Sequence, residues 1–241
     1  MNNILITGGS SGIGRALVEE SLKNKYRVFF TYLNNEKNTK SILKKFKKNC
    51  FAIKTDLSSD YDVENLFLKI KKKTNSLNCI VNNASQSFKK NKFQNLNIKE
   101  IKKIFDVNVI GTYRVCKKAL PFLKKNSLIV NVTSTAAKFG GNSLTHYAPT
   151  KAAIENLTIG LSRDLSDQKI RVVNISPGII DTENMRKTNE IYTQNQLRKL
   201  SQTIPSGRLG TAKEVAKVIL WLQSKDGNYI NGTTITLNGG R

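Results

Sequence analysis

The sequence predicts an α/β protein built on a doubly wound, seven-stranded parallel sheet with helices on both faces. Short apolar runs alternate along the chain with longer segments whose apolar residues recur at helical spacing, which is the pattern of such a sheet. A glycine-rich turn, Gly8–Gly14, lies between the first apolar run and the first helical segment. With 241 residues, 39% of them hydrophobic, the chain has the size of one ordinary domain, and we expect a single domain over residues 1–241.

The order of the expected elements follows from these patterns. Strands are expected near residues 3–7, 27–32, 50–54, 78–82, 127–133, 170–175 and 233–237. Helices are expected between them, near residues 12–24, 36–47, 60–74, 98–124, 146–167 and 212–223. Asn97–Glu100 and Thr211–Glu214 have the spacing of a capping box, which supports helix starts there. Pro149 is tolerated only in a first helical turn, so its helix should begin only a few residues earlier.

The first strand, turn and helix predict a site for a dinucleotide. Asn2–Thr7 is apolar, and Ile13, Leu17, Val18 and Leu22 recur at helical spacing after the glycines. Glycines in this place let a pyrophosphate approach the helix N-terminus, where unpaired N–H groups and the helix dipole favour an anion. The spacing is Gly-x-x-x-Gly-x-Gly, not the commoner Gly-x-Gly-x-x-Gly fingerprint.

Three side chains in the middle of the chain could form a carbonyl-binding site. Ser134 ends the apolar run Leu128–Ser134, which is expected to be a buried strand. Tyr147 and Lys151 are four residues apart, so a helix would place the phenol and the ammonium on one face. A nearby cation lowers the pKa of a phenol from about 10, which makes tyrosine usable as an acid or base. A solvated helix face is the alternative interpretation of this pair.

Six short motifs together identify a family. They are Thr7-Gly8…Gly12-x-Gly14, Asp56, Asn82-Asn83-Ala84, Asn108, Ser134 with Tyr147-x-x-x-Lys151, and Pro177-Gly178-x-x-x-Thr182. Each is modest alone, but their order and spacing are specific, and the chain resembles the short-chain dehydrogenase/reductase family over essentially all 241 residues. The resemblance implies a fold of the Rossmann type, in which ligands lie outside the carboxyl ends of the strands.

The resemblance also implies which residues bind the cofactor. The glycine turn should hold the phosphates, the residues after the third and fourth strands should meet adenine and its ribose, and the Pro177–Thr182 segment should hold the nicotinamide end. The expected set is Gly8, Ser10, Ser11, Gly12, Ile13, Gly14, Tyr32, Asp56, Leu57, Asn83, Ala84, Tyr147, Lys151, Pro177, Gly178, Ile180 and Thr182. The family usually has glycine after Asn-Asn-Ala, where this chain has Ser85; the preceding backbone can still make the contact.

NADP(H) is favoured over NAD(H) as the cofactor. Enzymes that select NAD carry an acidic residue at the end of the second strand to bind the ribose 2′-hydroxyl, and Tyr32 occupies that position here. No carboxylate occurs between Tyr32 and Glu36, so a 2′-phosphate would not be repelled, and Arg15 or Lys37 could neutralise it. Tyr32 could equally cover the adenine of either cofactor.

The implied reaction is reduction of a carbonyl to an alcohol by hydride transfer, or the reverse, with Asn108, Ser134, Tyr147 and Lys151 as catalytic residues. Ser134 and Tyr147 would hold the carbonyl oxygen, and Tyr147 would serve as the general acid. Lys151 would lower the pKa of Tyr147 and bind the nicotinamide ribose. Asn108 would interrupt the long helix and help to hold a water that feeds protons to Lys151, unless it is only a polar residue satisfied by a neighbouring carbonyl.

The sequence allows more than one class of substrate, and it also allows a protein without catalytic activity. Ile204–Gly210, the helix around Trp221 and Tyr229–Gly240 resemble bacterial 3-oxoacyl-carrier-protein reductases, which would imply an acyl-carrier-linked substrate and fatty acid biosynthesis. A sugar, polyol or other small ketone or alcohol is the alternative substrate. A non-catalytic protein that senses a dinucleotide or binds nucleic acid is the alternative class. Residues 183–205 occupy the family's substrate-loop position and are expected to be mobile until a ligand binds.

The net charge of +23 and the pI of about 10.0 do not by themselves predict a nucleic-acid partner. The lysine pairs are scattered over many expected helices, and no basic stripe interleaved with aromatic residues occurs. Compositional drift explains the charge, and attraction to an acidic acyl carrier would be a secondary use of it. No apolar stretch approaches the roughly 20 residues that span a bilayer, so no membrane partner is expected. The resemblance implies a homotetramer.

The cysteines and the single histidine indicate a reducing compartment without a metal site. Cys50, Cys79 and Cys116 are odd in number and well separated, which favours reduced thiols and a cytoplasmic location. The first strand begins at residue 2 or 3, which leaves no room for a signal peptide in this sequence. His146 is the only histidine and no Cys-x-x-Cys occurs, so zinc is not expected. His146 could line the substrate pocket or simply begin a helix.

Overall fold

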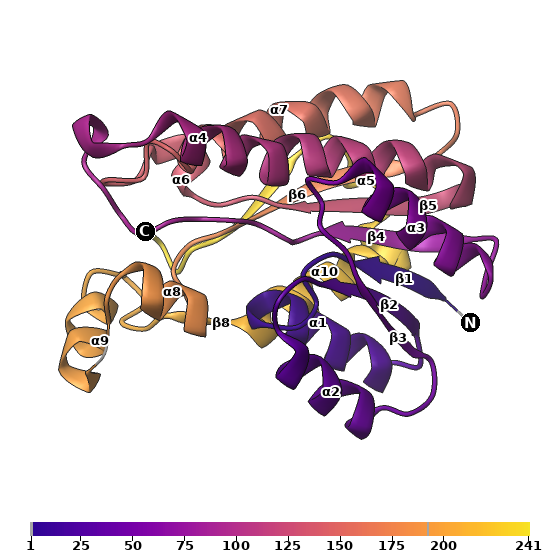
Figure 1. Ribbon diagram of the computed structural model, residues 1–241, viewed down its shortest axis with the longest axis horizontal. Coiled ribbons are helices and arrows are strands. Elements are labelled where there is room, and N and C mark those ends of the chain that lie inside the picture. The colour runs from indigo at the N-terminus through magenta and orange to yellow at the C-terminus, as the bar shows by residue number, and fades with distance from the viewer. Residues whose placement is uncertain (1, 192) are drawn as a thin grey trace.

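The computed structural model describes residues 2–191 and 193–241 (Figure 1). Seven parallel strands form a sheet in the order β3-β2-β1-β4-β5-β6-β9, between two layers of helices. The strands are β1 Asn3–Ile6, β2 Arg27–Tyr32, β3 Cys50–Lys54, β4 Leu77–Asn82, β5 Leu123–Val132, β6 Arg171–Pro177 and β9 Thr234–Leu237. The predicted fold class and the seven predicted strands are confirmed.

The alternation of side chains along each strand builds two cores, one on each face of the sheet. Ile4 and Ile6 of β1 pack with α1 (Gly12–Lys23), α2 (Glu36–Lys45) and α10 (Ala212–Leu222). Leu5, between them, packs on the other face with α3 (Asp60–Lys71) and α5 (Gly111–Ala119). Because both faces are covered, the central strand β1 is buried along its whole length.

The single helix predicted over residues 98–124 is wrong. The segment consists of α4 (Ile98–Phe105), a π-helical turn (Asp106–Ile110) and α5, followed by a 3-10 turn (Leu120–Phe122) that contains Pro121. Proline lacks the N–H that a continuing helix needs, and β5 begins directly afterwards at Leu123. The π-helical turn places Asn108 where the helix is interrupted, as the family resemblance implied.

The 183–205 segment, expected as a loop, contains two helices that project beyond the sheet (Figure 1). α8 (Glu183–Thr188) begins after Thr182, whose hydroxyl accepts the Met185 N–H at 3.2 Å. α9 (Gln194–Ser201) begins after Thr193 with a capping box. Neither helix has a buried residue, so apolar spacing could not have revealed them. Tyr192, inside the expected loop, lies outside the described residues.

Further short elements complete the carboxyl edge of the sheet. α6 (Ala136–Phe139) follows β5, and β7 (Ile180–Asp181) pairs with β8 (Gly210–Thr211) at the two ends of the projecting segment. The predicted capping box at Thr211–Glu214 is confirmed, whereas the Asn97 side chain accepts from Lys99 N–H at 2.8 Å instead. No helix within the two described ranges has both the length and the apolar character needed to cross a bilayer.

α7 (Ala148–Asp164) begins one residue later than Tyr147, with Pro149 in its first turn as expected. A chain of polar side chains anchors this helix to the buried centre of the sheet. Asn82 donates to Asn131 at 2.8 Å, Asn131 to Thr158 of α7 at 2.7 Å, and Thr158 to Asn174 at 2.6 Å. All four are buried, so each bond replaces contact with water that folding removes. The chain of bonds therefore fixes α7 against β4, β5 and β6.

Replacing Thr158 by Val should destabilise the protein, because the methyl group keeps the shape but leaves the Asn131 side-chain N–H and the Asn174 side-chain oxygen without the partner that Thr158 supplied. At about 1–3 kcal/mol for each of the two unsatisfied buried groups, we expect the unfolding free energy to fall by about 2–6 kcal/mol in urea-induced unfolding. Thr203→Val is the matched control, since its exposed hydroxyl donates only to the Leu200 carbonyl. Equal stability of the two variants would contradict the role of the polar chain.

Candidate active site

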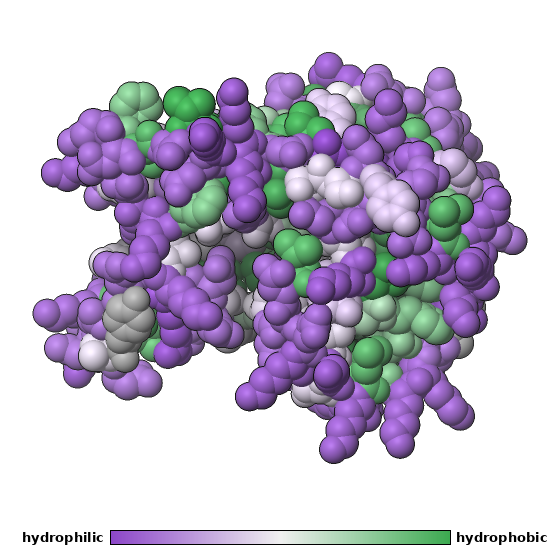
Figure 2. Space-filling model, viewed as in Figure 1, coloured by the Kyte–Doolittle hydropathy of each residue, from purple (hydrophilic) through white to green (hydrophobic). Residues whose placement is uncertain are grey.

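A cavity of about 990 Å³ opens along the carboxyl ends of the strands, where the strand order reverses between β1 and β4. It appears in Figure 2 as the hollow between the part of the molecule that carries α8 and α9 and the part that carries α4 and α6. Most of the predicted site residues line it: Gly8, Ser11, Gly12, Ile13, Tyr32, Asp56, Leu57, Asn83, Ala84, Ser134, Tyr147, Lys151, Pro177, Gly178, Ile180 and Thr182. Ser10, Gly14 and Asn108 are not among the lining residues.

The glycine turn is held by close backbone contacts. The Gly8 N–H donates to the Thr31 hydroxyl at 3.0 Å, and the Gly9 N–H donates to the Thr31 carbonyl at 2.8 Å. A Cβ on Gly14 would lie 2.2 Å from the Gly8 carbonyl oxygen, so only glycine lets α1 begin this close to the turn. Gly14 therefore serves packing of the helix against the turn, while Gly8 and Gly12 face the cavity.

The N-terminus of α1 suits an anionic group. In α2, α3, α4, α8, α9 and α10 the N-cap side chain accepts a backbone N–H of the first turn. Ser11, the N-cap residue of α1, makes no such bond, and it lines the cavity together with Gly12 and Ile13. Uncapped N–H groups and the positive end of the helix dipole favour a phosphate at this point. The residues present thus fit the pyrophosphate of a dinucleotide.

Asn83 has a structural task besides facing the cavity. Its side-chain amide donates to the carbonyls of Thr7 at 2.9 Å and Gly8 at 3.2 Å. The Thr7 hydroxyl in turn accepts the N–H groups of Asn83 and Ala84, both at 3.0 Å. These bonds clamp the end of β4 to the glycine turn, and they place Ala84 along the cavity between the two.

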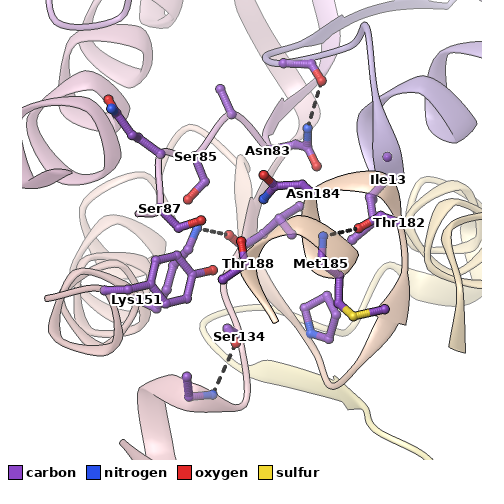
Figure 3. A pocket seen from close by; sticks show the side chains of 18 of the residues that line it. Ile13, Asn83, Ser85, Ser87, Ser134, Lys151, Thr182, Asn184, Met185 and Thr188 are labelled. Carbon is purple, nitrogen blue, oxygen red and sulfur yellow. Dashed lines mark hydrogen bonds between the residues drawn. The ribbon is translucent and has the colours of Figure 1, made fainter. Parts of the chain in front are cut away.

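Ser134, Tyr147 and Lys151 meet in one part of the cavity. Figure 3 shows Ser85, Ser134 and Lys151 around it, with Asn184, Met185 and Thr188 of α8 on the other side. Lys151 is buried, and its ammonium donates to the Val132 carbonyl at 3.0 Å and lies 5.6 Å from the centre of the Tyr147 ring. Tyr147, the N-cap residue of α7, and Lys151, one turn later, thus bring the phenol ring and the ammonium close to each other.

The expectation that Lys151 lowers the pKa of Tyr147 is not met in the protein alone. Burial raises the pKa of Tyr147 to about 12, and hydrogen bonds from the Ser85 and Ser134 side chains act in the opposite direction. Burial also lowers the pKa of Lys151 to about 8, because removal from water disfavours its charged form. The ammonium donates its hydrogen bond to the Val132 carbonyl and not to the phenol oxygen of Tyr147.

Asn108 supports the wall of the cavity from behind. Its side-chain oxygen accepts the Gln86 N–H at 2.7 Å, and its amide donates to the Gln86 carbonyl at 3.0 Å and to the Thr150 hydroxyl at 3.1 Å. Both functional halves of the amide are therefore satisfied by the protein. These bonds tie the π-helical turn to the segment after β4 and to the first turn of α7.

The adenosine end of the cavity carries no carboxylate after β2. Tyr32, Leu33 and Asn34 line it there, and among the described lining residues Asp56, after β3, is the single acidic side chain. Arg15, considered for a 2′-phosphate, donates to Glu19 at 3.0 Å, and neither Arg15 nor Lys37 is among the lining residues. The lining residues after β2 thus include no acidic side chain that would repel a 2′-phosphate. The two cations that were expected to neutralise this phosphate do not line the cavity.

Several lining residues were not predicted. They come from the segment after β4, from α4, from the loop before α7, from α8 and from the chain end: Ser85, Gln86, Ser87, Lys90, Lys103, Asn142, Leu144, Asn184, Met185, Thr188 and Arg241. Ser85 was noticed only as a departure from the family's glycine, and no periodic pattern marks the others. His146 is buried but does not line the cavity, which favours its interpretation as a helix-start residue. The described residues offer no group of three or more His, Cys, Asp or Glu side chains that could hold a metal ion.

Comparison with known proteins identifies the family of this chain. Residues 8–241 match the family described as Enoyl-(Acyl carrier protein) reductase. The chain is 33% identical to the uncharacterized oxidoreductase YgfF of Escherichia coli, with 98% of each chain covered. It is 29% identical to the 3-oxoacyl-[acyl-carrier-protein] reductase FabG of Haemophilus influenzae, over 98% of this chain and 96% of that one.

Solved structures agree with the sequence matches. The short-chain dehydrogenase/reductase of Brucella melitensis described as a glucose/ribitol dehydrogenase superposes with a TM-score of 0.91 at 30% identity, covering 99% of this chain and 96% of that one. A short-chain dehydrogenase of Burkholderia cenocepacia in complex with NADP has a TM-score of 0.90 at 26% identity, over 99% and 97% of the two chains. This chain belongs to the short-chain dehydrogenase/reductase family of NAD(P)-dependent oxidoreductases.

Proposed function

We propose that this chain is an NADPH-dependent reductase of a carbonyl group, with Ser134, Tyr147 and Lys151 as its catalytic residues. The observation that carries the proposal is the convergence of these three side chains in a cavity that begins at the uncapped N-terminus of α1. When bound, a nicotinamide dinucleotide supplies the hydride. The uncapped end of α1 holds its phosphates, and the Pro177–Thr182 segment holds its nicotinamide end.

The protein's own groups then position the carbonyl and move the proton. Ser134 and Tyr147 hold the carbonyl oxygen, where negative charge develops. With a pKa of about 12, the Tyr147 phenol is protonated at neutral pH, and its Oη donates the proton that completes the alcohol. Lys151, with a pKa near 8, is largely charged at neutral pH, and its ammonium would bind the ribose of the nicotinamide. Asn108 keeps the Gln86 backbone and α7 in place around this group.

The substrate that we favour is a 3-oxoacyl thioester on an acyl carrier, in fatty acid biosynthesis. The FabG likeness and the acyl-carrier name of the matched family support it. A sugar or polyol is the second candidate, because the Brucella structure with 30% identity is described as a glucose/ribitol dehydrogenase. The two candidates share the same catalytic residues and differ only in what the α8 side of the cavity accepts.

A homotetramer in the cytoplasm is the assembly and location that we propose. Exposed apolar side chains support an interface on the π-helical turn, α5 and α7: Ile110, Tyr113 and Ile159 are 46%, 44% and 39% exposed. The three cysteines are free and buried, which suits a reducing compartment. Light scattering of the purified chain measures the assembly directly.

Tyr147→Phe should abolish turnover and leave cofactor binding intact, because it removes only the phenol oxygen that donates the proton. In an NADPH-oxidation assay over 3-oxoacyl thioesters, sugars and small ketones, we expect at least a thousandfold loss of kcat, from the roughly 10²–10⁴-fold worth of general acid catalysis. Cofactor binding, followed by the fluorescence of NADPH, should change less than twofold. No turnover by the unaltered chain, together with salt-sensitive binding to RNA or DNA, would instead support a non-catalytic nucleic-acid-binding protein.

The cofactor preference should reverse when a carboxylate is placed after β2. We expect the unaltered chain to have a lower KM for NADPH than for NADH, because no acidic side chain follows β2 along the cavity. In Tyr32→Asp, repulsion of the 2′-phosphate should raise the KM for NADPH at least tenfold and lower that for NADH. Tyr32→Asn is the uncharged control. A preference for NADH in the unaltered chain would contradict the assignment.

Ser85→Gly should shift the pH dependence of alcohol oxidation upward, since this direction needs the Tyr147 phenolate. The Ser85 hydroxyl lowers the pKa of Tyr147, so its removal leaves the phenol protonated to higher pH. In a pH–rate profile of kcat/KM, the rising limb should move to higher pH, and Ser85→Thr, which retains a hydroxyl, should restore it. An unchanged pH–rate profile in the glycine variant would contradict the effect of Ser85 on the pKa of Tyr147.

A further inference from the structure

Two ammonium groups in the cavity are not used by the mechanism above. Lys90, after β4, and Lys103, on α4, both line it. Both lysines are exposed, and among the residues that the structure describes neither forms an ion pair. An unpaired cation that lines a ligand cavity is available to an anion that enters it.

Lys90 is an exposed residue whose two neighbours contact the substrate segment and the loop before Tyr147. Lys89 forms an ion pair with Glu190 of the substrate segment at 3.0 Å, and the Asn91 N–H donates to the Ser143 carbonyl at 3.1 Å. Ser143 is in the loop that leads to Tyr147 four residues later. Lys90 therefore lies where the substrate segment and the Tyr147 loop approach each other, at the substrate end of the cavity and away from β2.

The acidic residues nearby do not cancel this charge. In the substrate segment and just before it, Asp181 accepts from Arg186 at 2.8 Å, Glu183 from Lys187 at 2.7 Å, and Glu190 from Lys89 at 3.0 Å. Asp56, the single acidic side chain among the described lining residues, follows β3, and one of its oxygens accepts from the Ser58 N–H and hydroxyl. Among the described lining residues, Lys90, Lys103, Lys151 and Arg241 are basic and Asp56 is the single acidic side chain.

We propose that the substrate of this chain carries an anionic group, a carboxylate or a phosphate, on the same small molecule as its carbonyl, and that Lys90 binds this group. The inference rests on the proposed reduction, and it replaces the carrier-linked thioester considered there by a small anionic substrate. Lys90 would hold the anion while Ser134 and Tyr147 hold the carbonyl oxygen, so that the two ends of the substrate orient it in the cavity. Lys103 adds positive potential from α4.

The test compares matched pairs of carbonyl compounds with the purified full-length chain and NADPH. The pairs are 3-oxo acids of increasing length with their methyl esters, and dihydroxyacetone phosphate with dihydroxyacetone. We expect kcat/KM to be at least tenfold higher for the charged member of one or both pairs. The preferred pair also distinguishes a carboxylate from a phosphate. Lys90→Met should remove at least nine-tenths of that advantage through KM, with kcat and the neutral member unchanged. Lys92→Met, two residues away and not lining the cavity, should change neither.

Each remaining outcome decides the inference. Equal use of charged and neutral members, or equal losses for both in Lys90→Met, overturns it while leaving the reductase intact. A raised KM for NADPH but not NADH in Lys90→Met would assign the lysine to the 2′-phosphate and overturn it too. A loss confined to carrier-protein-linked substrates would assign Lys90 to the binding of a protein surface, which also overturns the inference. If the unaltered chain turned over none of the compounds, and so behaved like the Tyr147→Phe variant, the proposed function itself would be refuted.

Discussion

The placement of a phenol and an ammonium together along one cavity is the constraint on which the rest of this structure depends. Each group by itself resists ionisation there: burial raises the pKa of Tyr147 to about 12 and lowers that of Lys151 to about 8. Such a pair is costly to keep inside a protein unless other groups hold it. The Val132 carbonyl, the Ser85 and Ser134 hydroxyls and the first turn of α7 provide that support.

Much of the surrounding architecture serves the position of α7. The buried chain from Asn82 through Asn131 and Thr158 to Asn174 fixes the helix across three strands. The π-helical turn brings Asn108 to Thr150 at the start of the same helix and to the backbone of Gln86. The π-helical turn between α4 and α5 thereby holds the first turn of α7 in place. Rigid support of this kind is what a proton donor needs in order to act at one fixed atom.

The two ends of the cavity differ in charge and in how firmly they are built. Toward β1 and β2, the walls are strand ends and glycine contacts with atoms within 3 Å of where a side chain would be. Toward α8 and α9, they are polar helices without buried residues, attached through caps and exposed ion pairs. Exposed ion pairs contribute little to stability, so this end is the one suited to move around a substrate. Lys90 lies at that end.

The sequence by itself determined the sheet, its order of elements and many of the residues that line the cavity. Apolar runs, glycines and residues directly after strands are local signals, and in a parallel sheet the carboxyl ends meet at one edge. It could not reveal α8 and α9, whose stability depends on caps such as Thr193 and not on an apolar face. Nor could it show that Arg15 pairs with Glu19 or that Lys90 is one of the residues that line the cavity. Only tertiary structure decided the pKa of Tyr147, because that depends on how much water the neighbouring segments exclude.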